Sequence, residues 1–181
     1  RRDAAGLAYD GEREACAGFA VQGDAVHVLP AEAACAAARA LCGLGATIYL
    51  YDGKSLYRRG AGEGAAEDLR LFDVQVAGYL MAPDEGTPSF PKLRARFLPA
   101  SLSAAEGEAP EERAAERASA MLALGDVLRE RLEEAGLLAV FRDLPMPPLP
   151  VLPRLEERGL RLDPVFFRAP SAGLARAISA P

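Results

Sequence analysis

A cluster of prolines near the C-terminal end restricts the fold of this chain more than any other sequence feature. Proline lacks a backbone N–H and its ring clashes with the preceding helical turn, so no regular helix can run straight through such a cluster. The cluster therefore predicts a boundary after Gly136, with a folded unit before it and a kinked helical segment after it. The prolines are Pro145, Pro147, Pro148, Pro150 and Pro153.

The residues before this boundary predict a mixed sheet covered by helices. Two short β-prone runs at 16–22 and 25–29 flank a Gly-Asp turn, the pattern of a β-hairpin. An alanine-rich helix follows. The other expected elements are strands at 4–10, 47–51 and 69–72, a short helix at 55–59, helices from 73 and 87, and a long helix at 111–135. This order departs from the strict alternation of a Rossmann fold. It agrees with an α/β, ribonuclease-H-like mixed β-sheet flanked by helices, although periodicity alone does not single out that fold.

Charge and hydropathy exclude some classes of protein. The net charge is −5 and the pI about 5.1, which argues against tight, salt-driven binding of nucleic acid by the chain as a whole. Small basic patches, such as that around Lys54 and Arg58, are interpreted as solvated faces. Half of the residues are apolar, but no apolar run approaches the roughly 20 residues of a membrane span. We expect a soluble cytoplasmic protein with no membrane partner.

The cysteines and the single histidine give no sign of a metal site or of nucleophilic catalysis. Cys16, Cys35 and Cys42 form no CxxC pair, which favours apolar packing in a reducing cytoplasm. His27 lies in a β-prone run without a nucleophile elbow, and is expected to be a packed or surface residue. The glycine-rich stretch 60–64 lacks the Lys-Ser/Thr of a phosphate-binding loop and is interpreted as a flexible loop.

Three segments carry a resemblance to a known family. They are GFAVQGDAVHVLP at 18–30, LFDVQVAGYLMAPDEGTPSFPKLRARFL at 71–98, and VFRDLPMPPLPVLPRLEERGLRLDP at 140–164. Together they make the chain resemble the 3′–5′ exonuclease-like domain of bacterial DNA polymerase I, a family A DNA polymerase, followed by the start of the polymerase portion. The last segment is the most specific, because it is similar to the joining helix of that family without gaps.

The resemblance implies a site in which two metal ions are held by four carboxylates from three segments. Asp10 and Glu12 occupy the place of the first segment, an Asp-x-Glu. In the second segment, Leu56 occupies the place of the metal-binding aspartate and Asp52 that of an asparagine. In the third, Leu124 replaces the aspartate. The nearby Asp126 would point roughly 200° away on a helix and cannot replace it.

The resemblance therefore implies that the chain is a degenerate exonuclease-like domain without nuclease activity of its own. It would serve as a structural scaffold of a DNA polymerase I in replication and repair, with Asp10 and Glu12 as vestigial ligands and no cofactor. Its partners would be the polymerase portion of the same polypeptide and, through the full-length protein, DNA. Residues 1–136 would form the exonuclease-like domain, and 137–181 the connecting kinked helix and the truncated start of the polymerase portion. Because the sequence begins with Arg1 rather than Met, we expect a piece of a longer chain.

Two alternatives remain open. The chain could be an active Mg²⁺-dependent 3′–5′ exonuclease that uses Asp10 and Glu12 with other ligands, or a free-standing interaction module. Two expectations depend on the assigned register. Leu56 and Leu124 should lie near Asp10 and Glu12 and fill the former metal site, because a carboxylate cluster without cations is costly to bury. Asp73 should cap the helix that it precedes.

Overall fold

The structure, a computed structural model, describes residues 4–8, 16–21, 25–58, 69–103, 109–159 and 161. Its centre is a mixed five-stranded sheet with the order β3-β2-β1-β4-β5. The antiparallel pairs β1–β2 and β2–β3 form the meander, and β4 and β5 run parallel to β1. The strands are β1 (Ala4–Ala8), β2 (Cys16–Val21), β3 (Val26–Pro30), β4 (Thr47–Leu50) and β5 (Leu71–Asp73). The sheet confirms the expected α/β fold class and the hairpin.

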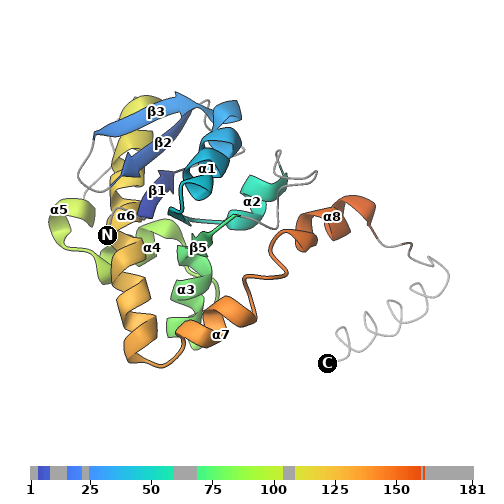
Figure 1. The fold of residues 1–181 in the computed structure, drawn as a ribbon. Coiled ribbons are helices and arrows are strands. Elements are labelled where there is room, and N and C mark those ends of the chain that lie inside the picture. The colour runs from blue at the N-terminus through green and yellow to red at the C-terminus, as the bar shows by residue number, and fades with distance from the viewer. Residues whose placement is uncertain are drawn as a thin grey trace, which may run out of the picture.

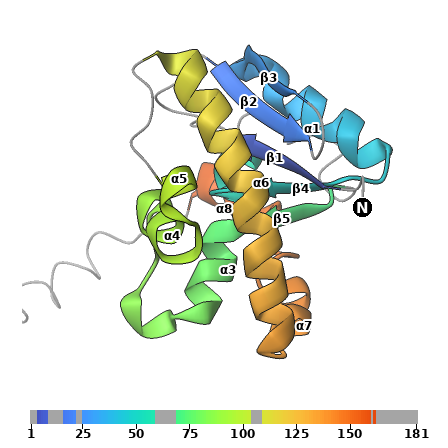
Figure 2. The same cartoon turned by 90° about the vertical axis from the view of Figure 1, so that its left-hand side faces the viewer.

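Helices cover both faces of the sheet, as Figures 1 and 2 show. One face carries α1 (Ala34–Gly43), which follows a turn of 3-10 helix, η1 (Ala31–Ala33). The other carries the long helix α6 (Pro110–Glu134), which crosses the strands diagonally in Figure 2. Side chains alternate between the faces along a strand. In β4, Ile48 and Leu50 accordingly pack with α1, whereas Tyr49 packs with α6.

Small residues allow α6 to lie close against the first two strands. A Cβ atom on Gly18 of β2 would collide with the carbonyl oxygen of Ala114, and one on Gly6 of β1 with that of Ala118. Ala114 and Ala118 are themselves fully buried. The contact is thus nearly backbone to backbone. Further along α6 the sheet side chains become larger, and the ring of Tyr49 fills the space over Gly125.

A group of shorter helices completes the α6 face. It consists of α3 (Val74–Met81), the 3-10 turn η3 (Pro83–Glu85), α4 (Phe90–Phe97) and α5 (Ala100–Ser103). Phe90 and Leu93 of α4 join the same core cluster as Leu124, Leu128 and Leu132 of α6. The buried Arg94 side chain donates from Nε and a terminal nitrogen to the carbonyl oxygen of Leu102, at 3.0 and 2.8 Å. This pair of bonds ties α5 to α4.

The described part of the chain after Gly136 forms two short helices with most of the prolines in the turns between them. Helix α7 (Leu138–Asp143) and helix α8 (Val151–Arg158) are separated by turns over 144–150. Phe141 of α7 packs on Phe72 of β5 with a ring-centroid distance of 4.5 Å. Leu149 packs with Tyr57 of α2 (Gly53–Arg58). The division into two domains at residue 136 stays a prediction, and residues on both sides of it share these clusters.

Candidate functional site

Parallel strands place their C-terminal ends at one edge of a sheet, where sites commonly form. Here this edge is made by the ends of β1, β4 and β5. The two residues assigned as vestigial ligands, Asp10 and Glu12, come after β1 and lie outside the described residues. The structure does describe the segments at the ends of the other two strands. Asp52 and helix α2 follow β4, and Asp73 ends β5 just before helix α3.

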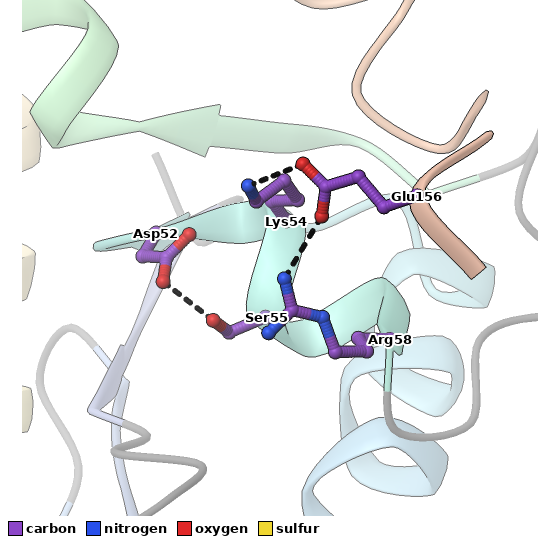
Figure 3. Close-up of polar contacts among 5 residues, drawn as sticks. All are labelled: Asp52, Lys54, Ser55, Arg58 and Glu156. Carbon is purple, nitrogen blue, oxygen red and sulfur yellow. Dashed lines mark hydrogen bonds and ion pairs between the residues drawn. The ribbon is translucent and has the colours of Figure 1, made fainter. Parts of the chain in front are cut away.

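Asp52 is engaged in the turn that opens α2. Its backbone is left-handed, with φ of 58°, a conformation that aspartate tolerates better than most residues. The hydroxyl of Ser55 donates to Oδ2 of Asp52 at 2.5 Å, and the Ser55 backbone N–H donates to the Asp52 carbonyl oxygen at 3.1 Å. Figure 3 shows the Asp52 carboxylate turned toward Ser55. Asp52 is therefore a turn residue whose carboxylate is bonded to the Ser55 hydroxyl.

Asp73 caps α3, as predicted, and also holds α2. Its Oδ1 accepts from the backbone N–H groups of Gln75 and Val76 at 2.8 and 3.3 Å. Its Oδ2 accepts from the backbone N–H of Gly53 at 2.7 Å, a link between two helices that no local sequence pattern predicts. The side chain is only 2% exposed. Burial raises the pKa of Asp73 to about 6, in spite of the three N–H donors that lower it.

Leu56 and Leu124 pack in separate clusters on the two faces of the sheet. Leu56 is 1% exposed and lies with Ile48 and Leu50 on the α1 face. Leu124 is 0% exposed and lies with Tyr49 and Phe72 on the α6 face. The expectation that the two leucines fill one apolar site together is therefore wrong. Asp10 and Glu12 lie outside the described residues, so the expectation that the two leucines lie near them stays a prediction.

Asp126 points away from Leu124, in line with the helical geometry. Leu124 is buried, whereas Asp126 is exposed and accepts a hydrogen bond from the hydroxyl of Tyr49 at 3.1 Å. Burial is the main cause that raises the pKa of Tyr49. The link joins β4 to α6 beside the contact of Tyr49 with Gly125. Sequence reasoning missed it, because no pattern connects residues so far apart along the chain.

The histidine, the cysteines and the glycine-rich stretch that the sequence analysis considered do not form a site in the part of the chain that the structure describes. His27 is exposed on the edge strand β3. Cys35 and Cys42 are half-buried free thiols, and burial raises the pKa of both. The glycine-rich stretch 60–64 is outside the described residues. Within the ranges that the structure describes, no three His, Cys, Asp or Glu residues gather closely enough to hold a metal ion.

The mixed sheet of order β3-β2-β1-β4-β5, with α1 and α6 on opposite faces, is consistent with a ribonuclease-H-like fold. No protein-family model matches the chain. It is 35% identical over 133 residues to DNA polymerase I of Treponema pallidum (strain Nichols), an alignment that covers 64% of this chain and 13% of that protein. The chain is homologous to a domain region of DNA polymerase I, a family A DNA polymerase.

A solved structure has a similar fold. It is the POL domain of Pol1 from M. smegmatis in complex with a DNA primer-template and dNTP. Its TM-score is 0.65 at 23% identity, and the match covers 88% of this chain and 29% of that chain. The chain therefore spans only a small part of the length of the polymerases that it matches. None of the helices in the described ranges is both long and apolar enough to cross a membrane.

Proposed function

We propose that the chain is a catalytically inactive exonuclease-like domain that serves as a structural scaffold of a DNA polymerase I in the cytoplasm. The observation that carries the proposal is the burial of Leu56. The family resemblance assigns a metal-binding aspartate to this position, and Leu56 is packed among apolar side chains. Leu124 is buried on the opposite face of the sheet, so the two leucines cannot both occupy ligand places of one site, and the register assigned from the resemblance is wrong for one of them.

The chemistry of two-metal hydrolysis explains why these residues matter. One metal activates the attacking water and the other stabilises the leaving oxygen, and hard cations such as Mg²⁺ need oxygen ligands. A leucine side chain supplies none. Each ~1.36 kcal/mol of lost transition-state stabilisation lowers the rate about tenfold, so the loss of one metal is enough to silence such a site. The carboxylates described at this edge, Asp52 and Asp73, are already bonded to Ser55 and to backbone amides.

The packing of the connecting segment supports a scaffold role. Phe141 of α7 belongs to the main core, and Leu149 packs against Tyr57 of α2. The sheet and the segment that resembles the joining helix are thus held by shared apolar contacts. We place the polymerase portion of the same polypeptide as the partner of this unit, and DNA as a ligand of the whole polymerase rather than of this chain.

An assay of nuclease activity tests the first half of the proposal. The purified chain is incubated with end-labelled single-stranded DNA and Mg²⁺ or Mn²⁺, beside a variant in which Asp10 and Glu12 are both changed to Ala. We expect no 3′–5′ degradation above that of the variant. Cleavage by the chain that the double substitution abolishes would make it a working exonuclease and reject the inactive assignment.

Removal of the domain tests the second half. A polymerase portion joined to this chain is compared with the same portion lacking residues 1–136, by the temperature at which primer extension is half lost. We expect a lower temperature after the removal, because the apolar contacts of the scaffold are lost. An unchanged temperature would reject the scaffold role and leave the nuclease result standing by itself.

A further inference from the structure

A cavity of about 380 Å³ opens between the neighbouring helices α3 and α4 (Figure 2). Its walls come from these two helices and from the turn η3 that joins them, and none of its lining residues belongs to the candidate site at the ends of β4 and β5. The volume is near the lower end of the range of roughly 300–1,000 Å³ that small-molecule sites occupy. The cavity is therefore of a size to admit a large apolar side chain of a partner rather than a large cofactor.

The floor of the cavity is apolar, because α3 offers only small residues on this side. Gly78 and, directly after the helix, Ala82 both line the cavity. A Cβ atom on Gly78 would lie 2.4 Å from the side chain of Leu93, so Leu93 of α4 packs directly on the backbone of α3. Leu93 is buried, whereas Ala82 contributes only a methyl group to the wall. A longer side chain at position 82 would enter the cavity.

Two cations stand at the mouth of this cavity. Lys92 and Arg96 line it and are exposed, and their spacing of four residues places them on one face of α4. Arg96 is held in place, because one terminal nitrogen donates to Oε1 of Glu85 at 2.9 Å and its guanidinium lies 5.5 Å from the centre of the Phe97 ring. A guanidinium has five N–H donors, so the bond to Glu85 leaves donors for another carboxylate.

The charge of Lys92 is not used within the described fold. The sequence contains only two lysines, and the other, Lys54 of α2, pairs with Glu156 of α8 at 2.9 Å (Figure 3). Lys92 forms no hydrogen bond or ion pair with any residue in the described ranges. Since Arg96 balances the charge of Glu85, Lys92 leaves the mouth positive in a chain whose net charge is −5. An anionic group is the complement of this mouth.

We propose that the cavity between α3 and α4 binds an acidic peptide segment of a partner protein. A carboxylate of the segment pairs with Lys92 and Arg96, and a large apolar side chain beside it enters the cavity and contacts Leu93 and Ala82. The inference goes beyond the proposed scaffold function and does not depend on it.

The charges at the mouth favour a peptide over a nucleic-acid strand. A strand of phosphates is bound by several cations that displace its counterions. This mouth offers one uncompensated cation, and the carboxylate of Glu85 stands beside it. The apolar floor adds to the preference, because a phosphate backbone has nothing to bury there, whereas an apolar side chain gains from leaving water.

Titration of the whole chain with two model peptides, followed by amide chemical shifts, tests the proposal. The probe is Asp-Asp-Asp-Phe, and Asp-Asp-Asp-Ala keeps its charge without the ring. We expect saturable shifts in α3, η3 and α4 with the first peptide, and binding at least about fivefold weaker with the second, because the ring is what leaves water. Added salt should weaken both, since the ion pairs are exposed.

Three variants separate the charge from the cavity. Lys92→Glu reverses the charge at the mouth, and Arg154→Glu makes the same change at an exposed position of α8 as the matched control. Ala82→Leu fills the cavity without changing any charge. We expect Lys92→Glu and Ala82→Leu each to weaken binding of Asp-Asp-Asp-Phe at least about fivefold, and Arg154→Glu to leave it unchanged. Lys92 is exposed, so its substitution remains a valid test even if Ala82→Leu fails to fold.

Several results would overturn the proposal. Absence of saturable binding, or equal affinity for the two peptides, would mean that the cavity admits no apolar side chain. Equal loss in Lys92→Glu and Arg154→Glu would mean general attraction to charge rather than a site at α4. Tighter binding of an oligo-dT strand than of either peptide, abolished by Lys92→Glu, would make nucleic acid the ligand.

Discussion

Helices α6 and α8 both carry leucines at helical spacing, yet they use them in opposite ways. Leu124, Leu128 and Leu132 of α6 are completely buried against the sheet. Leu152 and Leu155 of α8 are exposed, and the helix is held instead by Glu156 and Pro153. Apolar burial is worth far more than an exposed ion pair. The comparison teaches that α6 is part of what makes the domain fold, whereas α8 is only weakly held.

The sharpest test of this comparison is the same substitution in both helices. Leu128→Ala should destabilise the chain by roughly 2–5 kcal/mol, because it leaves a cavity in the core under the sheet. Leu155→Ala should change stability by less than about 0.5 kcal/mol in the chain alone, because the side chain is already in water. Urea unfolding followed by circular dichroism measures both. Similar losses for the two variants would show that α8 is as integral to the fold as α6.

Two carboxylates that bond to α2, Asp73 and Glu156, have pKa values that shift in opposite directions. Asp73, buried beneath α2, has its pKa raised from its ordinary value near 3.8 to about 6, chiefly by burial. Glu156, on the surface above α2, has its pKa lowered by the hydrogen bonds from Lys54 and Arg58. The buried carboxylate should therefore dominate how the stability of this region changes with pH.

The sign of the Asp73 effect is set by linkage. A raised pKa means that the folded chain binds the proton more tightly, so this contribution to stability is complete below pH about 4 and is lost as the pH rises to about 6. The difference in unfolding free energy between the native chain and Asp73→Asn should fall by on the order of 2–3 kcal/mol across that window, at ~1.36 kcal/mol per unit. Urea unfolding at several pH values measures it. A difference that grows with pH would contradict the assignment.

The backbone contact between α6 and the sheet can be tested with a single methyl group. Gly18→Ala should destabilise the chain by roughly 1–3 kcal/mol, because the new Cβ collides with the rigid carbonyl of Ala114. Gly43→Ala is the control, since nothing lies within 4 Å of a Cβ at that position. It should be neutral or slightly stabilising. If Gly18→Ala were equally harmless in thermal unfolding, α6 would be able to move away from the sheet and the contrast with α8 would weaken.

Local patterns in the sequence predicted much of this fold but little of its long-range detail. The Gly-Asp turn between two β-prone runs predicted the hairpin, and the position of Asp73 before an apolar helical run predicted its cap. Both signals act between near neighbours. The family resemblance supplied the layout of the sheet, which local periodicity did not single out.

The features that could not be predicted depend on which face of an element meets which neighbour. Leu56 and Leu124 were assigned to one site, but lie in clusters on opposite faces of the sheet. Glu156 of α8 pairs with Lys54 and Arg58 of α2, a contact that no local pattern in the sequence predicts. Such choices are decided by contacts between residues about 100 positions apart, for which a single sequence carries no signal.

The smallest effect expected is the loss of the ion pairs of Glu156, and it would show whether they set the orientation of α8. Glu156→Gln should leave global unfolding nearly unchanged, because exposed ion pairs contribute little. It should, however, speed amide hydrogen exchange within α8 by a few-fold. Raising the salt from about 0.05 to about 1 M should do the same to the native chain, since screening weakens exposed pairs. Salt should add nothing further in the variant.

The neighbouring Glu157 provides the matched control for this last experiment. Glu157→Gln removes the same charge from the same helix, and its side chain forms no hydrogen bond or ion pair with any residue that the structure describes. It should leave exchange in α8 unchanged. Acid gives an independent check. Because the pKa of Glu156 is lowered, its contribution is present above its ordinary value near 4.5 and is lost as the pH falls below it. Exchange in α8 that responds equally to both substitutions, or to neither, would mean that Pro153 and Leu149 hold the helix and that Glu156 does not orient it.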